Sequence, residues 1–236
     1  MTSRDSKISK QVQGKSTPTS EHLVNILKAG LATAPFCGGL ASLITDYIPS
    51  AKTKRLEEFS RKISEDLERL QAQVNEELLH TDDFAFMLEQ SFRGVAENYQ
   101  PEKIEAFRGI LVNSAVGFSA PAAEREYFLN LVSSLSALHL RILKFIAMPN
   151  RYLAEMGIEE GRIRGGFSDF FPIAIPGVNA EVIKSSFGDL YQFGFLNTDK
   201  SIFTTMTSGQ GLELLGHGGR VTTLGKKFIH FCSVPQ

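Results

Sequence analysis

The chain has 236 residues, of which 42% are hydrophobic and 22% charged, a composition typical of soluble globular proteins and sufficient for one large domain or two small ones. Its net charge of −1 gives no electrostatic reason to expect nucleic acid or an acidic substrate as a partner. The two cysteines, Cys37 and Cys232, lie far apart in the sequence, which excludes a disulfide scaffold and a CxxC metal site and favours the reducing cytoplasm.

Residues 1–20 form a polar segment whose charges sum to +3. Because it has too few apolar side chains to build a core, we expect a disordered basic tail. The first ten residues contain no apolar run, so the sequence predicts no cleavable signal peptide.

Residues 29–45 form an uncharged run of 17 residues that is rich in glycine and alanine, and Pro35 should divide it into two short helices. Small residues allow close helix packing, so one interpretation is a buried helical hairpin. The alternative is insertion into a membrane, although a spanning helix needs about 20 apolar residues. In either case the predicted contact residues are Gly30, Ala34, Pro35, Gly38 and Gly39.

Residues 52–80 show the clearest amphipathic pattern, with apolar side chains recurring every three or four positions and charged residues between them. We interpret this segment as one helix of a bundle, with a coiled-coil dimer seam as the alternative. Further helices are predicted to start at Thr81, which precedes two aspartates, and at Pro101 and Pro121. Short connections favour antiparallel neighbours, so residues 21–134 are predicted to form an antiparallel helical array.

Residues 135–149 are the densest apolar segment with a recognisable start and stop. Ser136 is a predicted N-cap, and Pro149 should end the helix. The few charged residues in between, among them Arg141 and Lys144, cannot cover a solvated face, so this helix should lie in a core.

The rest of the chain suggests mixed structure. Residues 179–195 are predicted to form a helix, residues 201–206 and 220–222 to be paired strands, and Thr223 to begin a last helix. This order resembles a winged helix. The predicted fold is therefore mainly α: an antiparallel helical array, followed at residues 135–236 by a winged-helix-like α+β module with a small β-hairpin.

No local motif in the sequence supports catalysis. Residues 219–227 superficially resemble a phosphate loop, but the glycine spacing is one residue too long and Lys227 stands where a hydroxyl must hold Mg²⁺. The five histidines show no metal-ligand spacing, and there is no GxSxG sequence. We therefore predict no enzyme, with no catalytic residues, cofactor or metal.

A winged module could bind DNA through its second long helix and hairpin. The candidate nucleic-acid or partner contacts are Asn179, Lys184, Gln192, Arg220, Lys226 and Lys227. Residues 178–236 carry a net charge of only +1, whereas phosphate binding needs a concentrated positive surface.

Several segments together resemble the bacterial abortive-infection alpha family, a group of uncharacterised proteins linked to phage defence. The resemblance is carried by residues 36–40, 54–59 and 223–228, by Leu135 and Ser136 with His139 and Leu143, and by Cys232. It implies a bacterial cytoplasmic protein with a role in anti-phage defence, and it supplies no catalytic residues.

The sequence thus favours a non-enzymatic interaction or regulatory protein that acts through protein–protein contacts, with an unidentified protein partner or a second copy of itself. The first alternative is a membrane-associating or membrane-disrupting effector that uses residues 29–45 at the inner membrane. The second is a DNA-binding regulator. No small-molecule substrate is predicted.

Overall fold

The computed structural model describes residues 48–117, 120–205, 211–216 and 219–235, with side chains from residue 51 onward. Within these ranges, five helices precede residue 135: α2 (Ile48–Arg69), α3 (Glu76–Leu79), α4 (Asp82–Glu97), α5 (Pro101–Ala115) and α6 (Ala122–Ser134). After them come α7 (Ala137–Ala147), α8 (Pro149–Met156), η1 (Glu160–Arg162), α9 (Phe167–Ala174), α10 (Ala180–Gln192), η2 (Lys200–Phe203), α11 (Glu213–Gly216) and α12 (Thr223–Phe231).

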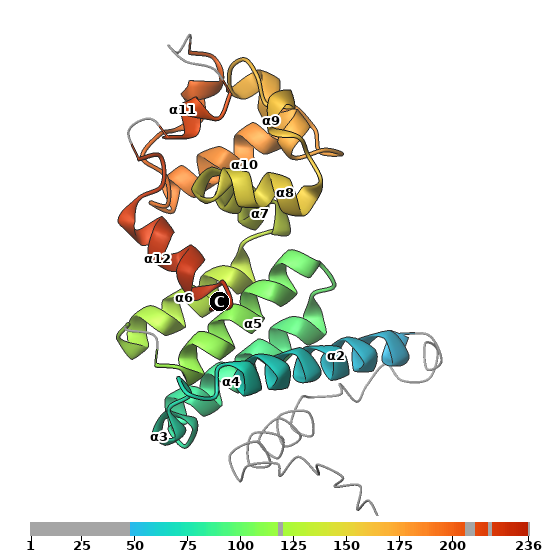
Figure 1. Cartoon of the computed structure of the whole chain (residues 1–236), viewed down its shortest axis with the longest axis vertical. Helices are drawn as coiled ribbons and strands as arrows, with labels where there is room; N and C mark the ends of the chain where they lie inside the picture. Colours follow the sequence, from blue (N-terminus) through green and yellow to red (C-terminus); the bar gives the residue numbers. More distant parts are fainter. Residues whose placement is uncertain (1–47, 118–119, 206–210, 217–218, 236) are drawn as a thin grey trace, which may run out of the picture.

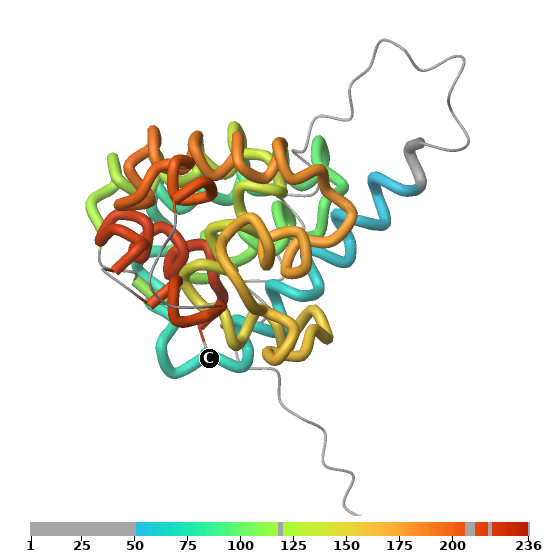
Figure 2. Tube along the Cα trace, turned by 90° about the horizontal axis from the view of Figure 1, so that it is seen from above, coloured from blue at the N-terminus to red at the C-terminus, as the bar shows by residue number. Residues whose placement is uncertain are grey.

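The helices gather into two groups. Helices α2–α6, the N-terminal group, lie together, and α7–α11, the C-terminal group, lie above them in Figure 1. Helix α12 returns from the C-terminal group and packs on both α5 and α7. Figure 2, seen from above, shows the start of α2 projecting from one side of the body. A continuous cluster of buried apolar side chains runs through both groups, and its largest members within the described ranges are twelve fully buried phenylalanines.

Local signals in the sequence set several helix ends, as predicted. The Thr81 hydroxyl accepts the Phe84 N–H at the start of α4, and Pro101 is the first residue of α5. Ser136 caps α7, and the His139 side chain completes a capping box. Pro149 ends α7 but also begins α8, because a proline fits the first turn of a helix.

The predicted single helix over residues 52–80 is wrong in its extent. Helix α2 ends at Arg69, and a turn leads to α3, which Asn75 caps by accepting the Glu77 N–H. The apolar stripe of α2 is buried against α4 and α5, as expected for a bundle helix.

The predicted winged-helix module with its β-hairpin is also wrong, since the described residues contain no β-strand. Residues 201–203 of the predicted first strand lie in the 3₁₀ helix η2, which Asp199 caps through the Ser201 N–H. Phe203 packs against the rings of Phe167, Phe171 and Phe187. This capping and aromatic packing outweigh the β propensity of the segment. The returning segment instead makes one antiparallel bridge, between Leu196 and Val221.

Several predictions lie outside the described residues or stay untested. The basic tail (1–20) and the small-residue run (29–45), with all five of its proposed contacts, belong to residues that the structure does not describe. The division into domains at residues 134 and 135 stays a prediction.

The described part of the chain has no single helix long and apolar enough to cross a membrane. Helices α6 and α7 would pass this test only as a pair, and they are bent by 117° relative to each other.

Candidate functional site

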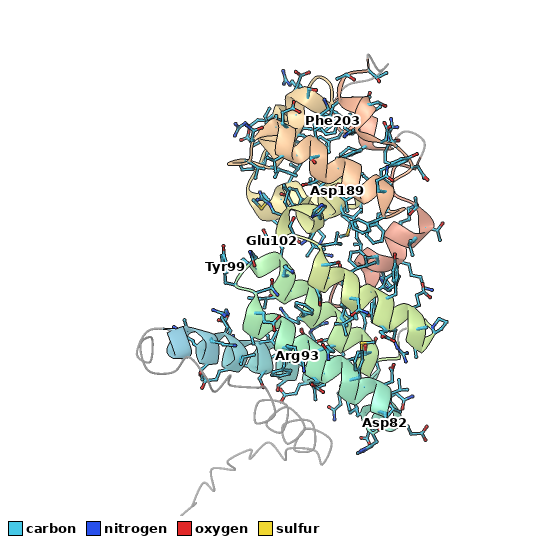
Figure 3. The ribbon with its side chains drawn as sticks, turned by 180° about the vertical axis from the view of Figure 1, so that it is seen from behind. Asp82, Arg93, Tyr99, Glu102, Asp189 and Phe203 are labelled. Atoms are coloured by element: carbon cyan, nitrogen blue, oxygen red, sulfur yellow. The ribbon has the colours of Figure 1, made fainter. Side chains whose placement is uncertain are left out.

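A cavity of about 680 Å³ lies where the two helical groups and α12 meet, and we call it the interface cavity. Its volume is within the range of small-molecule sites. Residues of α5, α7, α8 and α12 line it, together with the last residues of α2 and the C-terminal segment 232–235. Glu102, which belongs to this lining, lies at the junction of the two groups in Figure 3.

The end of α12 is fixed directly on α5. A Cβ added at Gly109 would lie 2.2 Å from the Cys232 carbonyl oxygen, so only glycine permits this approach. The Asn113 side-chain amide nitrogen is 2.8–3.3 Å from four carbonyl oxygens, those of Gly109, His230, Phe231 and Ser233. The carbonyls of Phe231 and Ser233 lie at and just after the end of α12, where a helix leaves carbonyl groups without helical partners. This contact holds the C-terminal segment at the edge of the interface cavity.

One ion-pair network lies beside this contact. Arg108 donates to both carboxylate oxygens of Asp66, at 2.5 and 2.9 Å, and to Glu105 at 2.8 Å. The hydrogen bond with Asp66 is the main reason that the pKa of Arg108 is raised. Arg69 reaches the same carboxylate at 3.3 Å and donates to the Pro235 carbonyl oxygen at 2.8 Å. The network therefore joins α2, α5 and the C-terminal segment.

A second network joins α7 and α8. Lys144 and Arg151 donate to the two oxygens of Glu155, at 2.6 and 3.0 Å. Burial acts to raise the pKa of Glu155, but these two hydrogen bonds outweigh it and hold the pKa below its ordinary value. Both cations are thus committed to a protein carboxylate.

Arg141 differs from the other cations of the cavity. Its Nε atom lies 3.7 Å from Glu102 Oε1, an ion-pair distance too long for a hydrogen bond, and this buried nitrogen has no hydrogen-bond partner within the described part of the chain. Arg69, Arg108, Lys144 and Arg151 all donate hydrogen bonds. The Tyr152 hydroxyl, in the same lining, is also buried and unpartnered among the described residues. Buried donors of this kind are costly unless something satisfies them.

The predicted nucleic-acid contacts do not line this cavity, and three of them are engaged within the protein. Asn179 caps α10 through the Glu181 N–H. Arg220 donates to the Leu214 carbonyl and the Thr198 hydroxyl, and Lys227 donates to Glu124. Lys226 and Gln192 are exposed, and Lys184 is half-buried.

A serine, histidine and aspartate lie in hydrogen-bonded order at the start of α7. Ser136 Oγ is 2.7 Å from His139 Nδ1, and His139 Nε2 is 3.2 Å from Asp189 Oδ2. The Ser136 backbone N–H also donates to His139 Nδ1, and Ser136 Oγ accepts the His139 N–H. None of the three residues lines the interface cavity. We interpret the arrangement as a helix cap that Asp189 ties to α10.

Sequence reasoning missed the interface cavity, because its residues come from five separate segments. The available signal was the presence of Arg141 and Lys144 in an otherwise apolar helix. Such cations in a core helix need partners, which sequence order does not reveal.

Comparison with known proteins adds nothing to this geometry. No family model matches the chain, and no curated protein or solved structure matches it either. The resemblance to the abortive-infection alpha family therefore stays a prediction. Within the ranges that the structure describes, no group of three or more histidine, cysteine or acidic side chains could hold a metal ion.

Proposed function

We propose that this protein is a non-enzymatic regulatory protein that responds to a ligand in the interface cavity and acts through a protein partner, with bacterial defence against phage as its setting. The position of the cavity is the observation that carries this proposal. Its walls come from both helical groups and from residues 228–235. A molecule bound there contacts α5, α7 and the C-terminal segment together. The bound molecule therefore stabilises this arrangement of α12 over any arrangement of α12 to which the molecule does not bind.

The pairing of charges favours binding over catalysis. Asp66 is committed to Arg108, and Glu155 to Lys144 and Arg151. Both carboxylates are thus engaged in holding the protein's own cations, whereas a general acid or base must be free to exchange its proton during the reaction.

A phage-infection assay tests both parts of this proposal. Leu140→Trp places a larger side chain in the cavity wall, and Val182→Trp is the matched control on the exposed surface of α10. Both variants must first show the circular dichroism and melting temperature of the wild type. We expect bacteria that express the wild type or Val182→Trp to restrict phage plating, and those that express Leu140→Trp to lose the restriction.

Two outcomes would contradict the proposal in different ways. If the wild type restricts none of a panel of phages, the defence role is refuted. If Leu140→Trp protects as well as Val182→Trp does, the cavity is not the regulatory site.

The structure bears differently on the membrane hypothesis and the DNA-binding hypothesis. The membrane hypothesis depends on residues 29–45, outside the described ranges, and liposome flotation of the wild type beside Gly38→Asp still tests it. The DNA-binding hypothesis was based on the winged hairpin. Residues 200–203 form η2 instead, so that hypothesis has lost its structural basis.

A further inference from the structure

We propose that the interface cavity binds a small amphipathic molecule with a single carboxylate, which Arg141 receives while the apolar body packs along α7 and α12. This inference rests on the proposed function, because it identifies the chemical class of the ligand. Three features of the cavity carry it: its charge balance, the surroundings of Arg141, and its apolar wall.

The charge balance favours one negative charge on the ligand. Five cationic side chains line the cavity: Arg69, Arg108, Arg141, Lys144 and Arg151. Four carboxylates line it as well: Asp66, Glu102, Glu105 and Glu155. Among the described residues that line the cavity, one positive charge is left over. A monoanion neutralises it, whereas a second charge on the ligand would face the carboxylates without compensation.

Arg141 is the group best placed to receive that charge. The other four cations already donate hydrogen bonds to the protein. The Arg141 side chain is 19% exposed, and its ion pair with Glu102 is 3.7 Å long. A guanidinium carries five N–H donors in a planar fork that matches the two oxygens of a carboxylate.

Helix α5 adds to the attraction. Its first two residues, Pro101 and Glu102, line the cavity, and its N-cap residue Gln100 makes no side-chain capping bond. The N-terminus of a helix of 15 residues carries a partial positive charge that favours an anion nearby. At present the Glu102 carboxylate occupies this position beside Arg141.

The remaining wall suits an apolar body. Leu140 and Leu143 of α7, Ile229 of α12 and Val234 line the cavity, and Met156 of α8 lies at its edge with 43% of its surface exposed. Methionine adapts its shape readily to different apolar ligands. A chain of several methylene groups would bury its surface here.

Because Glu102 competes for Arg141, two substitutions should change affinity in opposite directions. Arg141→Met removes the receiving cation and keeps an apolar side chain of similar length. Glu102→Gln removes the competing charge and leaves Arg141 in place. A structural role for Arg141 alone would not make Glu102→Gln bind tighter.

Isothermal titration calorimetry of the full chain with octanoate tests the inference, with 1-octanol and octyl phosphate as probes of the same length. We expect octanoate to bind with a stoichiometry of one, and 1-octanol to bind about tenfold more weakly or worse. Octyl phosphate should bind no more tightly than octanoate. Arg141→Met should weaken octanoate binding by about 10- to 100-fold, and Glu102→Gln should strengthen it severalfold. Arg93→Met, on the exposed surface of α4, should leave it unchanged.

Equal affinity for octanoate and 1-octanol, an unchanged affinity in Arg141→Met, or no binding of octanoate would each overturn the inference. If octyl phosphate bound more tightly than octanoate, the carboxylate ligand would be refuted in favour of a phosphate ester. The phage assay with Leu140→Trp does not depend on these titrations. If it succeeds while they fail, the cavity is regulatory but takes a ligand of another class.

Discussion

The contact of α12 with α5 depends on the absence of a side chain at Gly109, so Gly109→Ala should destabilise the protein. An added Cβ would lie 2.2 Å from the carbonyl oxygen of Cys232, 2.3 Å from its carbonyl carbon and 2.7 Å from the Ser233 nitrogen. All three are backbone atoms, which no change of rotamer can move away. The variant can therefore fold only if the end of α12 shifts.

The expected magnitude follows from three contributions. Overpacking of a core costs about 1–3 kcal/mol. A shift of α12 also weakens the two N–H bonds of Asn113, at about 0.5–1.5 kcal/mol each. Against this, alanine favours a helix by up to about 1 kcal/mol over glycine. The midpoints of these ranges give a net loss in free energy of unfolding of about 3 kcal/mol, or a fall of about 6–12 °C in melting temperature for a chain of this size.

Urea denaturation followed by circular dichroism measures this loss, and Gly188→Ala on α10 is the matched control. A Cβ at Gly188 meets only the flexible side chain of Lys200, at 3.2 Å, so this variant should be as stable as the wild type or slightly more stable. If Gly109→Ala were as stable as Gly188→Ala, the tight approach of α12 to α5 would be refuted.

Three further outcomes are expected. Arg108→Met leaves the buried Asp66 carboxylate without its main partner and should cost about 2–4 kcal/mol in urea denaturation, whereas Arg93→Met, in an exposed pair, should cost less than about 0.5 kcal/mol. Ser136→Ala removes the α7 cap and should lower the free energy of unfolding by about 1 kcal/mol. Covalent labelling of Ser136 by a fluorophosphonate, detected by mass spectrometry, would contradict our interpretation of Ser136 as a cap. Burial raises the pKa of the Cys232 thiol above its ordinary value of 9.0, so above that pH the unfolded chain loses a proton that the folded chain keeps, and stability falls as pH rises. Between pH 8 and pH 10, Cys232→Ala should lose less stability than the wild type. If both proteins lose the same stability over this range, the raised pKa of the Cys232 thiol is refuted.

The interface cavity changes the functional picture that the sequence suggested. The sequence indicated packing surfaces and no small-molecule site. The structure places an arginine without a hydrogen bond from the described residues in a cavity of about 680 Å³ between two helical groups. We therefore propose a small-molecule binding function beside the predicted function in protein interaction, and the two are compatible in a regulatory protein.

The sequence by itself determined the features that depend on a few neighbouring residues. Thr81 and Ser136 cap helices, Pro101 begins one, and the apolar stripe of α2 lies in the core. Caps and stripes act within one or two helical turns, so local sequence is sufficient to specify them.

Only the tertiary structure decided which distant segments meet. Residues 201–206 have a composition that suits a strand, yet Phe203 contacts rings of α9 and α10, and residues 201–203 lie in η2. The cavity likewise depends on Gly109 and Asn113 receiving the end of α12 more than 100 residues later in the chain. Packing of this kind sums contributions from several elements at once, and those elements become neighbours only when the chain folds.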